Sequence, residues 1–319
     1  MISSLELARL CGVSQGTVDR ALHDRSGIST ATRDRILTVA RQHGYLPNPT
    51  ARELMGRAAS PMVGVVLPES GVQGTFFMDL IAAIGQRLRT DNLRLNLWPC
   101  LSEEYASVAA DVAARRQRAL VLMLPPEDLS LDPAISRAVP VVSLLLSNRS
   151  PGVISLIPDE RDYGRVATQH LLDLGHRRIA HLLGPIDHHV SHDRAEGYRA
   201  AMIAAGAEPQ VMANTVDDAV VARLRTAGIT AVFCHHDPQA MALIRCAHRA
   251  GLAVPGDLSV IGVDLSPTAA ALDATLTTVP YPYVGIAEQL AAVLAGRPLP
   301  PLPAPTVVVG RTSGPPRRG

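Results

Sequence analysis

From residue 62 onward, short apolar segments alternate with amphipathic segments, and this alternation limits the possible folds more than any other feature of the sequence. The apolar segments, which we expect to be β-strands, cover residues 62–67, 93–98, 119–124, 139–146, 178–183, 230–234, 258–263 and 306–309. The amphipathic segments predict helices over residues 77–88, 103–115, 163–174, 194–205 and 239–250. Strands that alternate with helices form parallel sheets covered by helices, and about 240 residues of this pattern suggest two lobes. We therefore predict an α/β body of two lobes, with a ligand beyond the carboxyl ends of the strands.

Residues 3–44 have a different pattern, which predicts three short helices. Ser3, Ser14 and Ser29 each stand where a helix N-cap is expected, and Glu6 completes a capping box with Ser3. The spacing of Ala8, Gly12 and Val18 is typical of a helix-turn-helix, which needs a small residue, a glycine at the turn and an apolar anchor. An ordinary three-helix cap on an enzyme is the alternative.

In a helix-turn-helix, the second helix enters the major groove of DNA with its leading side chains toward the base edges. Here we expect Gln15, Gly16 and Arg20 to face bases, since Gln pairs with adenine and Arg with guanine. Ser14 and Thr17 are better placed to contact phosphate.

Residues 47–56 predict a miniature helix, with Asn48 as its N-cap, Pro49 in its first turn and Gly56 after its end. About two turns are too few for a helix to persist alone in water. We expect it to form when DNA and a second copy of the chain pack on it; a flexible linker with fortuitous caps is the alternative.

Charge and composition are compatible with a DNA-reading head on a neutral body. Residues 1–60 carry eight Arg against five Asp and Glu, a net +3, whereas the whole chain carries only +1. The four cysteines have no CxxC spacing, the N-terminus does not resemble a signal peptide, and no apolar run approaches the roughly 18 residues of a membrane span. We therefore expect a cytoplasmic protein with no membrane partner.

Several motifs together resemble the lactose-repressor/galactose-repressor (LacI/GalR) family of bacterial regulators. In the head they are Gly12-Val13-Ser14, Thr17-Val18, Arg20-Ala21-Leu22, Thr32-Arg33, Gly44-Tyr45-x-Pro47-Asn48 and Ala51-Arg52-x-Leu54. In the body they are Leu174-Gly175-His176-Arg177-Arg178-Ile179, Gly184-Pro185, Arg194-x-x-Gly197, Val254-Pro255-x-Asp257-x-Ser259-Val260-x-Gly262-x-Asp264 and Leu276-Thr277-Thr278-Val279. The resemblance spans almost the whole chain.

The resemblance implies a transcription regulator, in most cases a repressor, that binds double-stranded operator DNA as a homodimer. It implies a DNA-binding domain over residues 1–46, a hinge helix over 47–57 and an effector-binding, dimerising domain over 58–319. Family hinge helices pair in the minor groove, where Leu54 occupies the position of a leucine that wedges open a base step, beside Asn48, Ala51 and Arg52. The body then resembles periplasmic sugar-binding proteins, with a sugar or polyol effector between its lobes.

The family's effector positions carry over to individual residues of this chain. Arg194 and Asp264 match residues that hold ligand hydroxyls, Asp237 matches an acidic residue, and Phe76 and Phe77 lie where ligand-facing aromatic side chains occur. This chain also departs from the family pattern. His236 replaces an asparagine, Asp159 lies in a segment that usually reads Val-Asp-Asn, and Asp19 replaces a serine in the recognition helix, where we expect it to pair with an arginine or face inward.

Two other functions remain open. An enzyme is one, because histidines in two loops beside Asp237 offer zinc ligands: His188, His189, His192, His235 and His236. Their spacing matches no defined zinc motif, and no GxSxG, Walker, HExxH or strand-linked GxGxxG motif is present, so we expect no catalysis, metal or cofactor. A solute-binding protein without DNA-binding activity is the other. Trp98 and Cys246 are expected to be core residues. The sequence names neither the effector nor the operator.

Overall fold

The computed structural model describes residues 2–22, 25–45, 61–69, 75–115, 117–184, 189–267 and 275–317. The chain divides into two compact units, a head of residues 1–60 and a body of residues 61–319. The expected hinge helix lies outside the described residues, and so do its four candidate DNA contacts, Asn48, Ala51, Arg52 and Leu54.

The head consists of three helices, as the capping pattern predicted: α1 (Ser4–Leu10), α2 (Gln15–Leu22) and α3 (Thr30–Gln42). The Ser3–Glu6 capping box is present, and Ser29 caps α3. Gly12 has φ +61 in the turn between α1 and α2, a conformation that glycine adopts without strain. The buried core draws on all three helices: Leu7, Ala8, Cys11, Val18, Ala21, Ile36 and Ala40.

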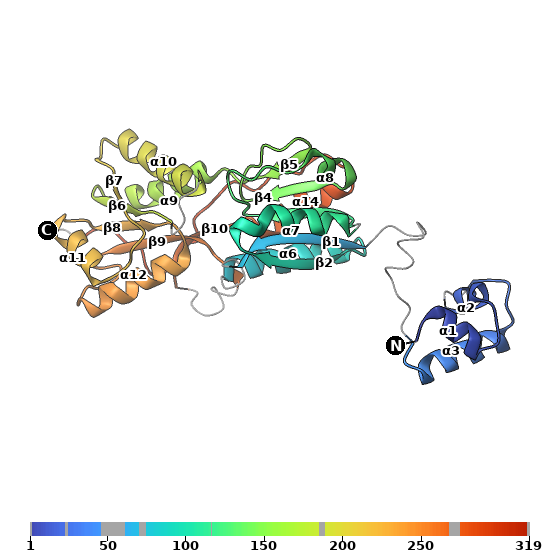
Figure 1. The fold of residues 1–319 in the computed structure, drawn as a ribbon. Helices are drawn as coiled ribbons and strands as arrows, with labels where there is room; N and C mark the ends of the chain where they lie inside the picture. Colours follow the sequence, from blue (N-terminus) through green and yellow to red (C-terminus); the bar gives the residue numbers. More distant parts are fainter. Residues whose placement is uncertain are drawn as a thin grey trace. The chain divides into compact units, whose positions relative to one another are not determined.

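The first lobe of the body is a five-stranded parallel sheet with the order β2-β1-β3-β4-β5 (Figure 1). Its strands are β1 (Met62–Pro68), β2 (Arg94–Cys100), β3 (Ala119–Met123), β4 (Val141–Leu144) and β5 (Val153–Leu156). Its helices are α6 (Thr75–Arg89), α7 (Tyr105–Ala114, after the 3₁₀ turn η1, Ser102–Glu104) and α8 (Pro133–Ala138). Successive residues of β1 enter different core clusters, Val65 on the α6 side and Val66 on the α7 side. Helices therefore cover both faces of the sheet, which explains why the strands are apolar throughout.

The second lobe repeats this topology, with the order β10-β9-β8-β6-β7 and all strands parallel. Its strands are β6 (Ile179–Leu182), β7 (Gln210–Met212), β8 (Ala231–Cys234), β9 (Ser259–Asp264) and β10 (Thr277–Pro280). Its helices are α9 (Glu160–Asp173), α10 (His189–Ala204), α11 (Asp218–Thr226) and α12 (Asp237–Arg249). Helix α9 lies on one side of the sheet and α12 on the other (Figure 1).

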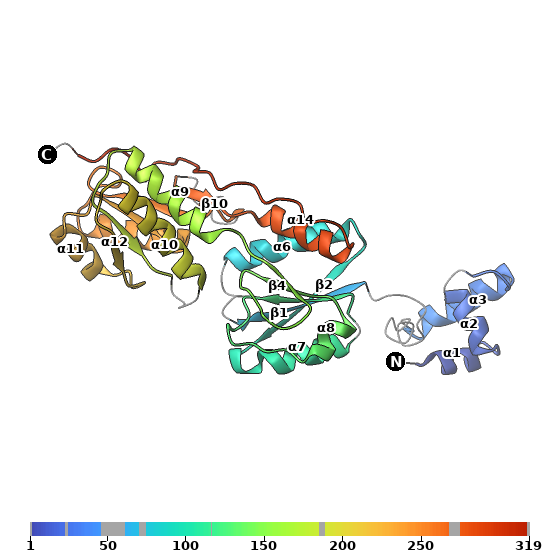
Figure 2. The same cartoon turned by 90° about the horizontal axis from the view of Figure 1, so that it is seen from above.

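The chain passes between the lobes three times. It crosses from β5 to α9 and then from β10 to α14 (Tyr283–Leu294), which packs against α6 in the first lobe (Figure 2). The segment after α14 returns to the second lobe, where Val308 pairs with Thr278. One buried cluster contains residues of both lobes, so the crossing segments share a continuous core.

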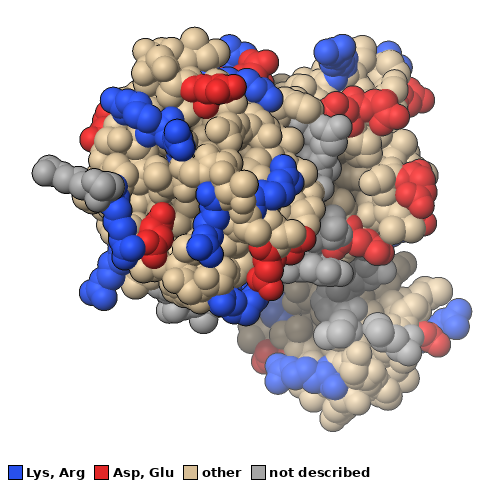
Figure 3. Space-filling model, turned by 90° about the vertical axis from the view of Figure 1, so that its left-hand side faces the viewer, with Lys and Arg blue, Asp and Glu red and all other residues tan. Residues whose placement is uncertain are grey.

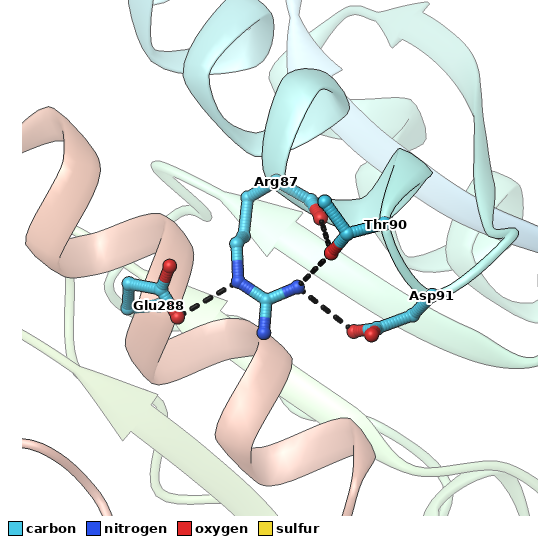
Figure 4. A network of polar contacts seen from close by, with 4 residues as sticks. All are labelled: Arg87, Thr90, Asp91 and Glu288. Atoms are coloured by element: carbon cyan, nitrogen blue, oxygen red, sulfur yellow. Dashed lines mark hydrogen bonds and ion pairs between the residues drawn. The ribbon is translucent and has the colours of Figure 1, made fainter.

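A polar network joins α14 to α6 in the first lobe (Figure 4). Arg87 of α6 donates from Nε to Glu288 of α14 at 2.7 Å, and from Nη1 to Asp91 at 2.9 Å and to Thr90 at 2.7 Å. The guanidinium therefore fixes the last turn of α6 to the helix that follows the second crossing.

The two-lobed α/β class is confirmed, but the expected elements were incomplete. The sequence pattern did not anticipate α8, β5, β7, α11, β10 or α14. The strand expected at 306–309 is wrong, because Val308 makes only an isolated antiparallel bridge in that Pro-rich segment. The strand expected from Val139 begins at Val141, since Val139 is the C-cap of α8.

None of the described helices is both long and apolar enough to cross a membrane.

Cys246 is buried, as the sequence predicted. Trp98 is only partly buried on the edge strand β2, and the Arg115 guanidinium lies 4.8 Å from its ring centroid.

Candidate functional site

The first candidate site is the exposed side of α2 in the head. Val18 and Ala21 turn toward the head core, whereas Gln15, Gly16 and Arg20 are exposed. Helix α2 therefore buries one face and leaves the other, with its leading polar side chains, open to a partner.

The hydroxyls expected to contact phosphate lie at the start of this helix. Ser14 Oγ accepts a hydrogen bond from the Thr17 backbone amide at 3.2 Å and lies 2.9 Å from Thr17 Oγ1. Ser14 is exposed and Thr17 is half-buried. The Gln15 amide donates from Nε2 to Ser4 Oγ of α1 at 2.8 Å.

Asp19 forms an ion pair with Arg25 across the end of α2, as the sequence predicted for a carboxylate in this helix. Arg25 Nη1 lies 3.0 Å from Asp19 Oδ2, and Arg33 Nη2 donates to the Arg25 carbonyl oxygen at 2.6 Å. The arginine reduces the repulsion that the carboxylate would exert on DNA phosphate.

The second candidate site lies in the body, where the carboxyl ends of the two sheets face each other. Ser266, just after β9, donates to Asp79 of α6. The His189 amide, at the start of α10, donates to Glu127 Oε1, in the segment after β3, at 2.9 Å. In doubly wound sheets this edge is where ligands bind.

Arg194 of α10 is central to the polar residues at this edge and is only 3% exposed. Its Nε donates to Glu160 Oε2 at 2.7 Å and its Nη1 to the His235 carbonyl oxygen at 2.6 Å. The Tyr281 hydroxyl donates to the other Glu160 oxygen at 2.7 Å, so one carboxylate ties together the first and second crossings. Although burial alone would lower the pKa of Arg194, Glu160 and Asp264 raise it above its ordinary value.

Two further carboxylates lie in the second lobe at this edge. Asp237 accepts hydrogen bonds from the Thr278 hydroxyl at 2.6 Å and the Leu265 amide at 2.8 Å. Burial raises the pKa of Asp237 to about 6 despite these bonds. Burial also raises the pKa of Asp264, and the neighbouring Asp237 and Glu160 add to the shift. Asp264 has φ +129, a strained backbone conformation of a kind that concentrates at functional sites.

Aromatic side chains gather beside these charges. Five of the chain's ten aromatic residues form one cluster of rings: Phe76, Phe77, Tyr163, Tyr281 and Tyr283. The rings of Phe76 and Tyr281 are 5.0 Å apart, and Arg194 lies 5.9 Å from the Tyr281 ring centroid. Apolar ring faces next to charged hydrogen-bonding groups suit a ligand with apolar faces and hydroxyl groups.

Among the candidate effector residues, Asp159 and His236 have local roles. Asp159 is exposed and accepts a hydrogen bond from the Asp162 amide as the N-cap of α9; the neighbouring Glu160 is the residue that turns inward to Arg194. His236 caps α12, and burial lowers its pKa to about 4.

Sequence reasoning missed Glu160, Tyr281, Tyr283 and Thr278. The only available signal for the tyrosines was a Tyr-Pro-Tyr pair in a chain with 3% aromatic residues.

The histidines considered as zinc ligands lie in two separate loops. His188 lies outside the described residues, and His189 lies beside Glu127. Across the part of the chain that the structure describes, no three His, Cys, Asp or Glu side chains form a group that could hold a metal ion.

Charge is mixed on the face of the molecule drawn in Figure 3, where basic side chains lie among acidic ones. Two ion pairs of the second lobe, Arg249–Asp218 at 2.8 Å and Arg317–Asp257 at 2.5 Å, show the same interspersion.

Comparisons with known proteins agree with this division into head and body. A family described as "Bacterial regulatory proteins, lacI family" matches residues 5–48, and a "Periplasmic binding protein-like domain" matches residues 168–313. The transcriptional regulator CelR of Thermobifida fusca is 30% identical over 310 residues, covering 91% of this chain and 90% of the relative. The regulator GalR of Salmonella typhimurium (strain SL1344) is 31% identical over 325 residues, covering 93% and 90%.

Two solved structures share the fold over 98% of this chain. A Lac repressor dimer bound to operator and an anti-inducer has a TM-score of 0.79 at 23% identity, covering 98% of this chain and 99% of that one. A complex of the regulator CelR with cellobiose has a TM-score of 0.62 at 26% identity, covering 98% and 100%.

Proposed function

The chain belongs to the LacI family of bacterial transcription regulators, and we propose that it is a repressor whose operator binding responds to a sugar or polyol. The observation that supports DNA reading most directly is the exposure of Gln15, Gly16 and Arg20 at the leading end and along the outer face of α2. A head that packed these side chains into its own core could not read a groove.

Two copies of the chain bind DNA in this proposal, each placing α2 in the major groove of one half-site about one helical turn from the other. Arg20 pairs with guanine and Gln15 with adenine. Ser14 and Thr17 contact phosphate. The hinge segment adds Asn48, Ala51 and Arg52 around the minor groove, and Leu54 wedges a base step.

The effector binds in the body, at the facing carboxyl ends of the sheets. Arg194, Asp237 and Asp264 supply charge-assisted hydrogen bonds to hydroxyl groups, while Phe76 and Phe77 supply apolar contact. His236 lines the same edge, and Asp159 stands at its rim. The relative CelR is known as a cellobiose complex, which supports a saccharide as the class of ligand.

This site also suggests how an effector changes DNA binding. Arg194 holds Glu160 on the first crossing, and Glu160 holds Tyr281 on the second. A ligand that hydrogen-bonds Arg194 competes with Glu160 for the guanidinium. This competition alters the contacts that hold the two crossing segments together, and the arrangement of the lobes depends on those contacts. Effector affinity and DNA affinity are then linked reciprocally.

The experiment is a selection of DNA sites from a random pool with the full-length protein, followed by affinity measurements with and without saccharides. We expect a palindromic sequence to be enriched, and at least one of cellobiose, galactose or a polyol such as ribitol to change its affinity. Arg194→Ala should remove the saccharide response, while the protein still selects the same DNA sequence because the side chains of α2 are unchanged. If no sequence is enriched, DNA reading by α2 is wrong; if the Arg194→Ala protein responds normally, the effector site is elsewhere.

A further inference from the structure

The strongest unassigned contact in the head joins the two helices of the helix-turn-helix motif. Ser4 is the first residue of α1, and its hydroxyl accepts a hydrogen bond from Nε2 of Gln15, the first residue of α2, at 2.8 Å. Gln15 is exposed and Ser4 is half-buried. No motif in the sequence singled out Ser4.

The backbone at Ser4 is held in place by its surroundings. The capping box of Ser3 and Glu6 holds the turn from which Ser4 projects, with hydrogen bonds of 2.9 Å and 3.1 Å. Leu7 of α1 and Val18 of α2 are both fully buried in the head core, which holds the two helices at a set separation. The backbone that carries the Ser4 hydroxyl is therefore held at a set distance from the first residue of the next helix.

The contact leaves the recognition chemistry of Gln15 intact. A glutamine amide has two N–H donors and one carbonyl acceptor. Ser4 uses one of the two N–H groups. The other N–H and the carbonyl oxygen stay available, and those are the two groups that a glutamine needs for bidentate pairing with N7 and N6 of adenine.

A free glutamine on a protein surface samples many rotamers and loses that freedom when it binds a base. A side chain that is already held in one orientation loses less, and so binds more tightly and discriminates more sharply. We infer that Ser4 is a positioning residue for base recognition: it holds the Gln15 amide in a single orientation on the outer face of α2.

This inference rests on the proposed base contact of Gln15. The test starts from the DNA site that the full-length wild-type protein selects from a random pool. The position at which Gln15→Ala loses base preference identifies the contacted base pair. The readout is a specificity ratio: the dissociation constant for the site with that base pair replaced, divided by the dissociation constant for the selected site.

Ser4→Ala is expected to reduce this ratio about three- to tenfold, the size of the rotamer freedom that a glutamine regains. Ser4→Thr, which keeps a hydroxyl, should restore most of it, and Ser4→Ala should have no effect in a Gln15→Ala background. Thr38→Ala, which removes an exposed hydroxyl from α3, is the matched control and should leave the ratio unchanged.

The outcomes separate the possible roles. An unchanged ratio in Ser4→Ala, or the same loss with and without Gln15, overturns the positioning role. A loss of affinity shared equally by all DNA sequences, together with a lower melting temperature, would mean that Ser4 only stabilises the head. If Gln15→Ala changes no base preference, the proposed contact of Gln15 fails, and the positioning role fails with it.

Discussion

The head and the body hold their candidate functional side chains in opposite ways. In the head, Gln15 and Arg20 are exposed on a helix whose other face forms the core. In the body, Arg194, Asp237 and Asp264 are each 5% exposed or less, although all three are charged residues. An exposed side chain can bind a partner and still contribute little to the free energy of unfolding. Removing the partner of a buried charged side chain, in contrast, lowers that free energy substantially. Substitutions should therefore separate binding from stability in the head, and should affect both in the body.

The largest effect is expected from Arg194→Met in the body. It leaves Glu160 buried without its cation, which should lower the free energy of unfolding by about 3–5 kcal/mol in urea titrations. Arg161→Ala removes an exposed ion pair with Glu196 on the neighbouring α9 surface and is the matched control. The double variant Arg194→Met/Glu160→Gln should recover part of the loss. An effect of Arg194→Met no larger than that of Arg161→Ala would mean that the buried pair does not stabilise the body.

The next effect is a dependence of stability on pH that comes from Asp237. Its pKa is raised to about 6 in the folded protein, so the folded state binds a proton more tightly than the unfolded state. The stabilisation is complete below the unfolded pKa near 4 and is lost as pH rises through about 6, by on the order of 1–3 kcal/mol. Asp237→Asn can keep contacts to Thr278 and Leu265 but cannot titrate. Its unfolding free energy should therefore change less than that of wild type between pH 4 and pH 7, and parallel curves would contradict this.

In the head, Arg20→Ala should change binding and not folding. We expect it to weaken specific DNA binding by about 1–3 kcal/mol and to relax the preference at one base pair. Its unfolding free energy should stay within about 0.5 kcal/mol of wild type. Competition measurements with base-substituted sites test the first part, and calorimetry of the free protein tests the second. A large loss of stability would show that Arg20 belongs to the head core after all.

The smallest effect is expected for Asp19→Asn at the end of α2. The exposed ion pair with Arg25 should contribute no more than about 1 kcal/mol to folding. Removing the carboxylate releases Arg25 toward phosphate, so nonspecific DNA affinity should rise and the slope of log affinity against log salt should steepen by about one. A slope that does not change would place Arg25 away from the DNA backbone.

Local rules predicted the head more completely than the body. The Ser3–Glu6 capping box, the Ser29 cap and the exposed face of α2 depend on residues within a few positions of one another, and all of these were found. The body site joins residues from α6, α9, α10, α12, β9 and the second crossing, and no periodicity relates them. Asp159 and Glu160 illustrate the limit, because two successive carboxylates look alike in sequence although one caps α9 in solvent and the other is buried against Arg194.

By itself, the sequence determined the three-helix head, the family to which the chain belongs, and a body of alternating strands and helices. These depend on capping, hydrophobic periodicity and short motifs, which act between residues that are close along the chain. Only the tertiary structure decided that α14 returns to the first lobe, that Glu160 and Tyr281 tie the crossings together, and that five aromatic rings gather beside Arg194. Several of those contacts join residues more than 100 positions apart, such as Glu160 and Tyr281 or Phe76 and Tyr281. They exist because two sheets bring their carboxyl ends together and bury charges that must then find partners.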